Sequence, residues 1–70
     1  MVKTLVILIL LFNGTLVKDR LNFNPPVTVL DCLAIGDVYR EVVSTYHGPG
    51  KDQGWYLNDG RGTIQGHYCE

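Results

Sequence analysis

The amino-acid sequence predicts an α+β fold of the order ββαββ, in which one amphipathic helix covers one face of a four-stranded antiparallel sheet. Three observations predict it: an Asn-Gly turn between two strand-like runs, a central segment with helical periodicity, and a second strand–turn–strand pattern near the C-terminus. The 70 residues allow one small domain. We expect a hairpin over residues 4–23, a helix over residues 28–47 and a second hairpin over residues 55–69.

The first hairpin is predicted by Asn13-Gly14, because this pair tolerates the positive φ angles that a two-residue hairpin turn requires. Such a turn pairs Leu10 with Val17. The second strand then alternates between apolar and polar residues, with Asp19 as a discordant member of its apolar face. The first strand is apolar on both faces, which is the most informative feature of the chain.

The helix is predicted to begin after Pro25-Pro26, which ends the second strand, with Thr28 as its cap and Asp31 completing a capping box. Gly48-Pro49 ends it. Gly36 within the helix indicates close backbone packing. The predicted core-facing stripe consists of Cys32, Ile35, Val38, Tyr39, Val42, Val43 and Tyr46.

The second hairpin raises a question about the two cysteines. If Ile64 and Tyr68 both face the helix, simple alternation points Cys69 away from Cys32. A bulge at Gly66 would turn Cys69 toward the helix, and an isolated strand glycine often marks a bulge.

Cys32 and Cys69 permit one intramolecular disulfide, which would contribute about 4 kcal/mol in the chain-entropy model and imply an oxidising compartment. The alternative is two reduced, packed thiols in a cytosolic protein. A less favoured alternative is a thiol-dependent redox protein, with Cys32 near a helix N-terminus and His47 or His67 as a base. The two cysteines and the two histidines together could supply four zinc ligands, but they lack the paired short spacing of a zinc site.

The N-terminus also resembles a signal peptide, because Lys3 precedes an apolar run. The run is too short for a membrane-spanning helix, and no small-residue cleavage site follows it. Cleavage after Gly14 would also remove the partner of the second strand. We therefore favour a strand, and expect a membrane association only if the N-terminus is a signal segment.

Composition argues against nucleic-acid binding, since the net charge is −1 and no cluster of Lys and Arg is interleaved with aromatic residues. No motif identifies a catalytic residue, a metal site or a cofactor, and we expect a non-enzymatic protein.

The functional prediction rests on one face of the first strand. If the helix covers the other face, an apolar row is exposed, and exposed apolar surface marks an interaction site. The row consists of Leu5, Ile7, Ile9 and Leu11. We expect it to bind a protein partner or a second copy of the chain. The alternatives are that the stems of Lys18 and Arg20 and the C-terminal strand cover the row, or that the chain is a secreted or periplasmic mini-protein with a cleaved signal and a disulfide.

Three segments together resemble short uncharacterised proteins of marine tailed bacteriophages and ocean metagenomes: residues 11–16 (LFNGTL), 39–41 (YRE) and 55–63 (WYLNDGRGT). The resemblance covers most of the chain and implies a small phage accessory protein in the cytoplasm of a bacterial host. It implies no activity, ligand or site residue.

Overall fold

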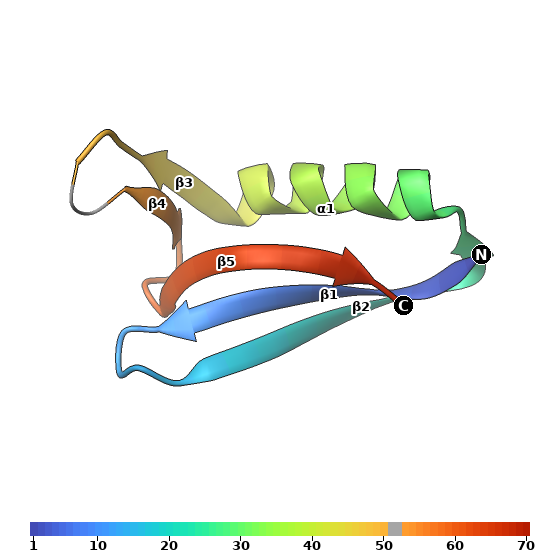
Figure 1. The fold of residues 1–70 in the computed structure, drawn as a ribbon, viewed down its shortest axis with the longest axis horizontal. Coiled ribbons are helices and arrows are strands. Elements are labelled where there is room, and N and C mark those ends of the chain that lie inside the picture. Colours follow the sequence, from blue (N-terminus) through green and yellow to red (C-terminus); the bar gives the residue numbers. More distant parts are fainter. Residues whose placement is uncertain (51–52) are drawn as a thin grey trace.

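The computed structural model describes residues 1–50 and 53–70 and confirms an α+β fold (Figure 1). In the described part of the chain, one helix accompanies a five-stranded antiparallel sheet of order β2-β1-β5-β4-β3. The predicted sheet had four strands, and the additional one is β3. The elements are β1 (Val2–Leu11), β2 (Leu16–Val27), α1 (Val29–Val43), β3 (Ser44–His47), β4 (Gly54–Leu57) and β5 (Gly62–Cys69).

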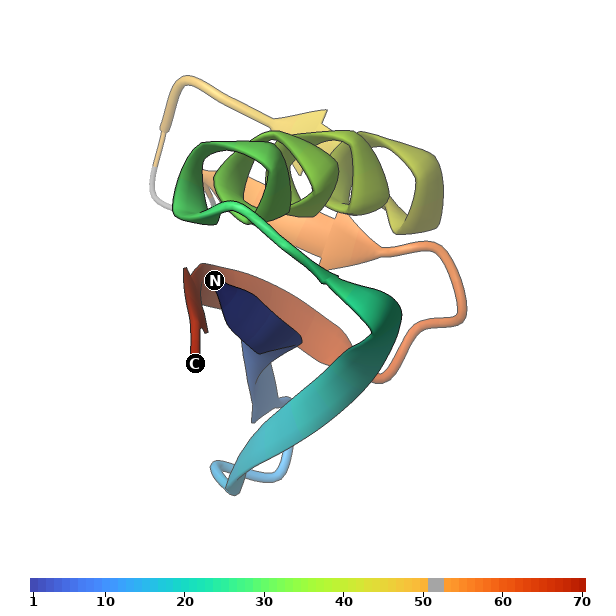
Figure 2. The same cartoon turned by 90° about the vertical axis from the view of Figure 1, so that its right-hand side faces the viewer.

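The helix forms a second layer above the sheet, and within the described residues the opposite sheet face carries no helix (Figure 2). β1 pairs with β2 on one side and with β5 on the other. β1 is therefore a central strand with no free edge. Side chains of neighbouring elements lie over both of its faces, which is consistent with apolar residues on both.

The helix begins as predicted and ends four residues early. The Asp31 backbone N–H donates to the Thr28 hydroxyl at 3.1 Å, which satisfies one free donor of the first turn. At the other end, Ser44 donates both its backbone N–H and its hydroxyl to the Arg40 carbonyl. The next residues pair with β4, where β-branched and aromatic side chains such as Thr45 and Tyr46 are favoured. The predicted helix over residues 28–47 therefore divides into α1 and β3.

The second strand runs past the prolines that were predicted to end it. β2 includes Pro25 and Pro26 and ends at Val27, opposite Val2. Proline is tolerated there because the pairing with β1 is irregular between Thr4–Asn22 and Val2–Val27, so Pro25 and Pro26 pair with no residue of β1.

The predicted register of the first hairpin is wrong by one residue. Leu10 pairs with Leu16, not with Val17. The turn takes one residue more than predicted: Gly14 has a φ of 90° and donates its N–H to Leu11, while the Thr15 N–H donates to the Asn13 side chain. Because side chains alternate with a period of two, this shift moves every β2 side chain to the other face relative to β1.

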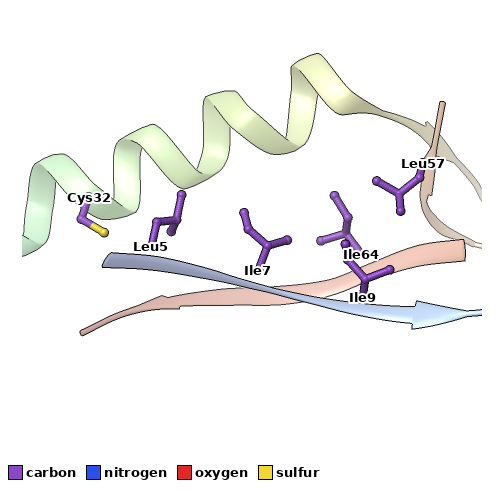
Figure 3. Packing of buried hydrophobic residues seen from close by; sticks show 6 residues of the cluster. All are labelled: Leu5, Ile7, Ile9, Cys32, Leu57 and Ile64. Atoms are coloured by element: carbon purple, nitrogen blue, oxygen red, sulfur yellow. The ribbon is translucent and has the colours of Figure 1, made fainter. Parts of the chain in front are cut away.

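The row that was predicted to be exposed lies in the core. Leu5, Ile7 and Ile9 are at most 2% exposed and point toward α1 (Figure 3), and Leu11 is half-buried. The corrected register places Val17 and Leu21 on this same inner face, so the face under the helix is the more apolar one. The outer face of β1 consists of Thr4, Val6, Leu8 and Leu10.

A bulge in β5 answers the question about the cysteines. Gly66 pairs with Leu8, but Ile64 pairs with Ile9, so Gln65 is an extra residue in the strand. The bulge next to Gly66 puts Ile64, His67 and Cys69 on the inner face, and Tyr68 on the outer face. It confirms the condition under which the disulfide was predicted.

Cys32 and Cys69 are bonded, with their Cα atoms 6.4 Å apart. The bond connects the first turn of α1 to the end of β5 across 37 positions of sequence. Closing a loop of this length stabilises the fold by about 4 kcal/mol in the chain-entropy model. In a small domain, this is a large part of the net stability.

Gly36 lies one helical turn after Cys32 and confirms the predicted close packing. A Cβ atom added to Gly36 would lie 2.6 Å from Nε2 and 3.0 Å from Cγ of His67. The imidazole therefore occupies the space that any other residue at position 36 would need.

We predict that Gly36→Ala destabilises the protein by about 1–3 kcal/mol, because overpacking at His67 exceeds the gain in helix propensity. In a His67→Ala background the same substitution should instead stabilise it by about 1 kcal/mol, which is the propensity difference alone. Urea unfolding of the four variants measures both values. A stabilising effect of Gly36→Ala with His67 intact would contradict the packing argument.

Candidate functional site

The structure does not assemble the thiol or zinc sites considered from the sequence. Both cysteine sulfurs are used in the disulfide. His67 packs under α1, while the His47 ring lies 4.7 Å from that of Tyr56 at the other end of the sheet. Among residues 1–50 and 53–70, no group of three or more His, Cys, Asp or Glu side chains is arranged to hold a metal ion.

The aromatic residues are also distributed over separate positions. Arg40 stacks on Trp55 with 4.5 Å between the guanidinium carbon and the ring centroid. Tyr56 contacts Phe12, and Tyr68 lies on the outer sheet face. These side chains serve local packing and do not form one aromatic surface.

A groove of about 340 Å³ opens between the second half of α1 and the sheet. It exists because α1 packs chiefly on β1, β5 and β3, and a helix about 10 Å wide covers only about two strands spaced about 4.8 Å apart. The edge strand β2 lies beyond its reach. The lining residues are Ile7, Ile9, Asp19, Tyr39, Val42, Val43, Leu57, Asn58, Asp59, Arg61 and Ile64.

The charged side chains at the rim of the groove form ion pairs with one another. Arg61 lies between two carboxylates, with Nε 2.7 Å from Asp59 and a terminal nitrogen 3.3 Å from Asp19. This contact explains why Asp19, the discordant residue of β2, is tolerated on an inner-facing position. The Arg61 backbone N–H, followed by its side chain, lowers the pKa of Asp59, and the two carboxylates raise the pKa of Arg61.

The outward side of α1 carries an aliphatic ridge. Its members recur every four residues and so follow one row of the helix surface. Leu30, Val38 and Val42 are 79%, 59% and 68% exposed. The ridge consists of Leu30, Ala34, Val38 and Val42. Three exposed carboxylates, those of Asp31, Asp37 and Glu41, lie on the same helix.

The outer face of the sheet is apolar along β1 and basic along β2. Val6 pairs with Arg20 and with Tyr68 and is fully buried between them. One alternative from the sequence was that basic side chains cover apolar residues of the first strand, but Arg20 covers Val6 on the outer face and not the buried row of Leu5, Ile7 and Ile9. Lys18 lies beside Leu8, with its Nζ 5.9 Å from the Tyr68 ring centroid. Arg20 forms an ion pair with Glu70.

The ridge was missed because Val38 and Val42 fitted the predicted core stripe. That stripe is wider than the surface that a single sheet layer can cover. The spacing of four between Leu30, Ala34, Val38 and Val42 was the available signal, since it separates a second apolar row from the core row around Cys32 and Gly36.

Comparison with known proteins gives no relative: no protein-family model, curated protein or solved structure matches this chain. Within residues 1–50 and 53–70, no helix has both the length and the apolar character needed to cross a membrane.

We predict that the Asp59 carboxyl titrates below its ordinary pKa of 3.8. Because the folded-state pKa is the lower one, the stabilisation is complete above 3.8 and is lost as the pH falls through the folded-state value. Arg61→Ala should restore only part of the shift, since the backbone N–H at position 61 remains. NMR titration of the carboxyl carbon measures both, and a value at or above 3.8 in the unmodified chain would contradict the assignment.

Proposed function

We propose that the protein is non-enzymatic and acts by self-association through the aliphatic ridge of α1. One observation carries this proposal: Leu30 and Val38 are exposed on the outward side of the helix, and the exposed Val42 continues their row to the rim of the groove. The outward side of a surface helix is normally polar, and contiguous exposed apolar residues mark a contact surface. This surface replaces the row of β1 that is buried in the core.

The size of the chain is compatible with such a contact. A stable interface takes about 800 Å² from each partner. This is about one sixth of the 4689 Å² that the chain exposes. At about 25 cal/mol per Å² of apolar area, covering the ridge gains several kcal/mol before the costs of association.

The charges near the groove support binding over catalysis. Asp19, Asp59 and Arg61 are engaged with one another. Both thiols are bonded. A general base must face a substrate site, whereas the carboxylates of Asp19 and Asp59 both face Arg61 in the observed arrangement. Basic residues are not clustered, which supports a protein partner over nucleic acid.

We predict that the wild-type chain shows a concentration-dependent mass above 7.8 kDa in sedimentation equilibrium. Val38→Lys should lower the association constant at least tenfold, because it places a charge in the centre of the ridge. Thr15→Lys, in the exposed turn of the first hairpin and away from α1, is the matched control and should leave association within about twofold. Far-ultraviolet circular dichroism checks that all three chains are folded. A wild-type chain that stays monomeric at millimolar concentration would overturn the proposal.

A second candidate function is that of a disulfide-stabilised protein of the periplasm or the extracellular space, and the Cys32–Cys69 bond favours it. The fold argues against removal of the N-terminal segment from such a secreted protein. Cleavage after Gly14 would remove β1, which pairs on both sides and supplies Leu5, Ile7 and Ile9 to the core. The host cytoplasm implied by the resemblance to phage proteins remains the alternative location.

Alkylation of the protein in its native cells before lysis tests the second candidate. An oxidising compartment predicts that Cys32 and Cys69 resist alkylation until a reductant is added, while the intact mass retains residues 1–14. Alkylation of both thiols without reductant would favour the host cytoplasm and reject this candidate.

A further inference from the structure

We infer that the self-association is head-to-tail: the ridge of α1 in one copy packs on the outer sheet face of the next copy. This inference rests on the proposed self-association and adds the surface that the ridge meets. Both surfaces are apolar at the centre, but they carry opposite charges at the margin.

The margin of the ridge is acidic. Asp31 and Glu41 form no ion pair within residues 1–50 and 53–70, and Asp37 has two basic neighbours, His67 Nε2 at 3.7 Å and Arg40 at 3.8 Å. Arg40 itself is turned onto Trp55. A symmetric interface between two copies of α1 would bring these carboxylates together, and like charges in contact cost several kcal/mol.

The margin of the outer sheet face is basic. Lys18 forms no ion pair among the described residues, and Arg20 lies beside it on the same face of β2 with Glu70 as its partner. Both side chains are exposed and lie next to Leu8 and Leu10 of β1, which are partly exposed, while Val6 on the same face is already covered by Arg20 and Tyr68. Long basic side chains can extend over a neighbouring apolar surface and reach a carboxylate beyond it.

The outer sheet face is long enough to receive α1. The 15 residues of α1 span about 22 Å, which is shorter than the roughly 33 Å of the ten-residue β1. Gly66 lies beside Leu8 on this face, and a Cβ added to it would meet no atom within 4 Å. The absence of a side chain there leaves a shallow place in which an aliphatic residue of the ridge can pack.

Head-to-tail contact uses two different surfaces, so each copy retains one surface that is still available for another copy. Such an interface produces a closed ring or an open chain, whereas a symmetric interface stops at a dimer. Each sheet would then lie between its own helix and that of its neighbour. This arrangement covers both faces of β1, which is apolar on both.

Mixing two single variants distinguishes these arrangements. Val38→Lys alters the ridge, and Leu10→Glu places an acid on the outer sheet face, opposite the acidic helix margin. Each variant alone should associate at least tenfold more weakly than the wild type. In an equimolar mixture, the intact sheet face of the first meets the intact ridge of the second, and a mass of at least two chains of 7.8 kDa should return.

Two controls accompany this experiment, one for folding and one for the charge contribution. Circular dichroism must show both variants folded; if Leu10→Glu does not fold, Leu16→Glu takes its place, because Leu16 is 57% exposed on the same face. Raising the ionic strength to about 1 M, where the screening length is about 3 Å, should weaken the mixed complex several-fold.

The result also separates this inference from the proposal it rests on. If wild-type chains associate and Val38→Lys prevents it, but Leu10→Glu has no effect or the mixture does not recover, the head-to-tail arrangement is overturned and self-association through α1 stands. If wild-type chains do not associate, both fail. Recovery in the mixture supports the head-to-tail contact, since a symmetric contact between two ridges predicts none.

Discussion

The burial of Leu5, Ile7 and Ile9 under α1 is the interaction on which the rest of the structure depends. These residues lie on the strand that pairs with both β2 and β5, so the same ten residues organise the ladder and supply the core. A domain of this size buries only about 60% of its unfolded surface, and a core this small has little stability in reserve. The disulfide and the packing of His67 on Gly36 hold the helix onto that core along β5.

The bulge at Gln65 and the turn at Gly14 show how single residues decide which face of a sheet a side chain occupies. Without the bulge, His67 and Cys69 would face away from the helix, and neither the disulfide nor the contact with Gly36 could form. With a shorter turn, Asp19 would lose the inner-face position from which it contacts Arg61. Local backbone geometry therefore fixes both the disulfide and the charged rim of the groove.

The sequence was sufficient for the fold class, the helix N-cap, the helix core positions around Cys32 and Gly36, and the condition for the disulfide, because each depends on local patterns. It was insufficient where two local preferences compete. Asn13-Gly14 is compatible with a two-residue turn and with the longer turn that forms, and the choice reverses the faces of β2. Residues 44–47 continue a helical stripe, but they also suit a strand, and pairing with β4 decides the outcome. The exposure of the ridge depends on how many strands one helix can cover, and no local sequence pattern specifies that number.

The mismatch between one helix and a broad sheet connects the fold to the proposed association. A helix packed on β1 and β5 leaves the inner side of β2, the outer sheet face around Leu8 and Leu10, and its own outward side without a helix over them. Burying all of the aliphatic residues would need a second helix, and the described chain has one. A neighbouring copy can supply that helix while its acidic margin meets Lys18 and Arg20. The inner face of β1 packs on the helix of its own chain. On the outer face Arg20 and Tyr68 already cover Val6, and Leu8 and Leu10 are suited to the proposed contact with the helix of the next copy.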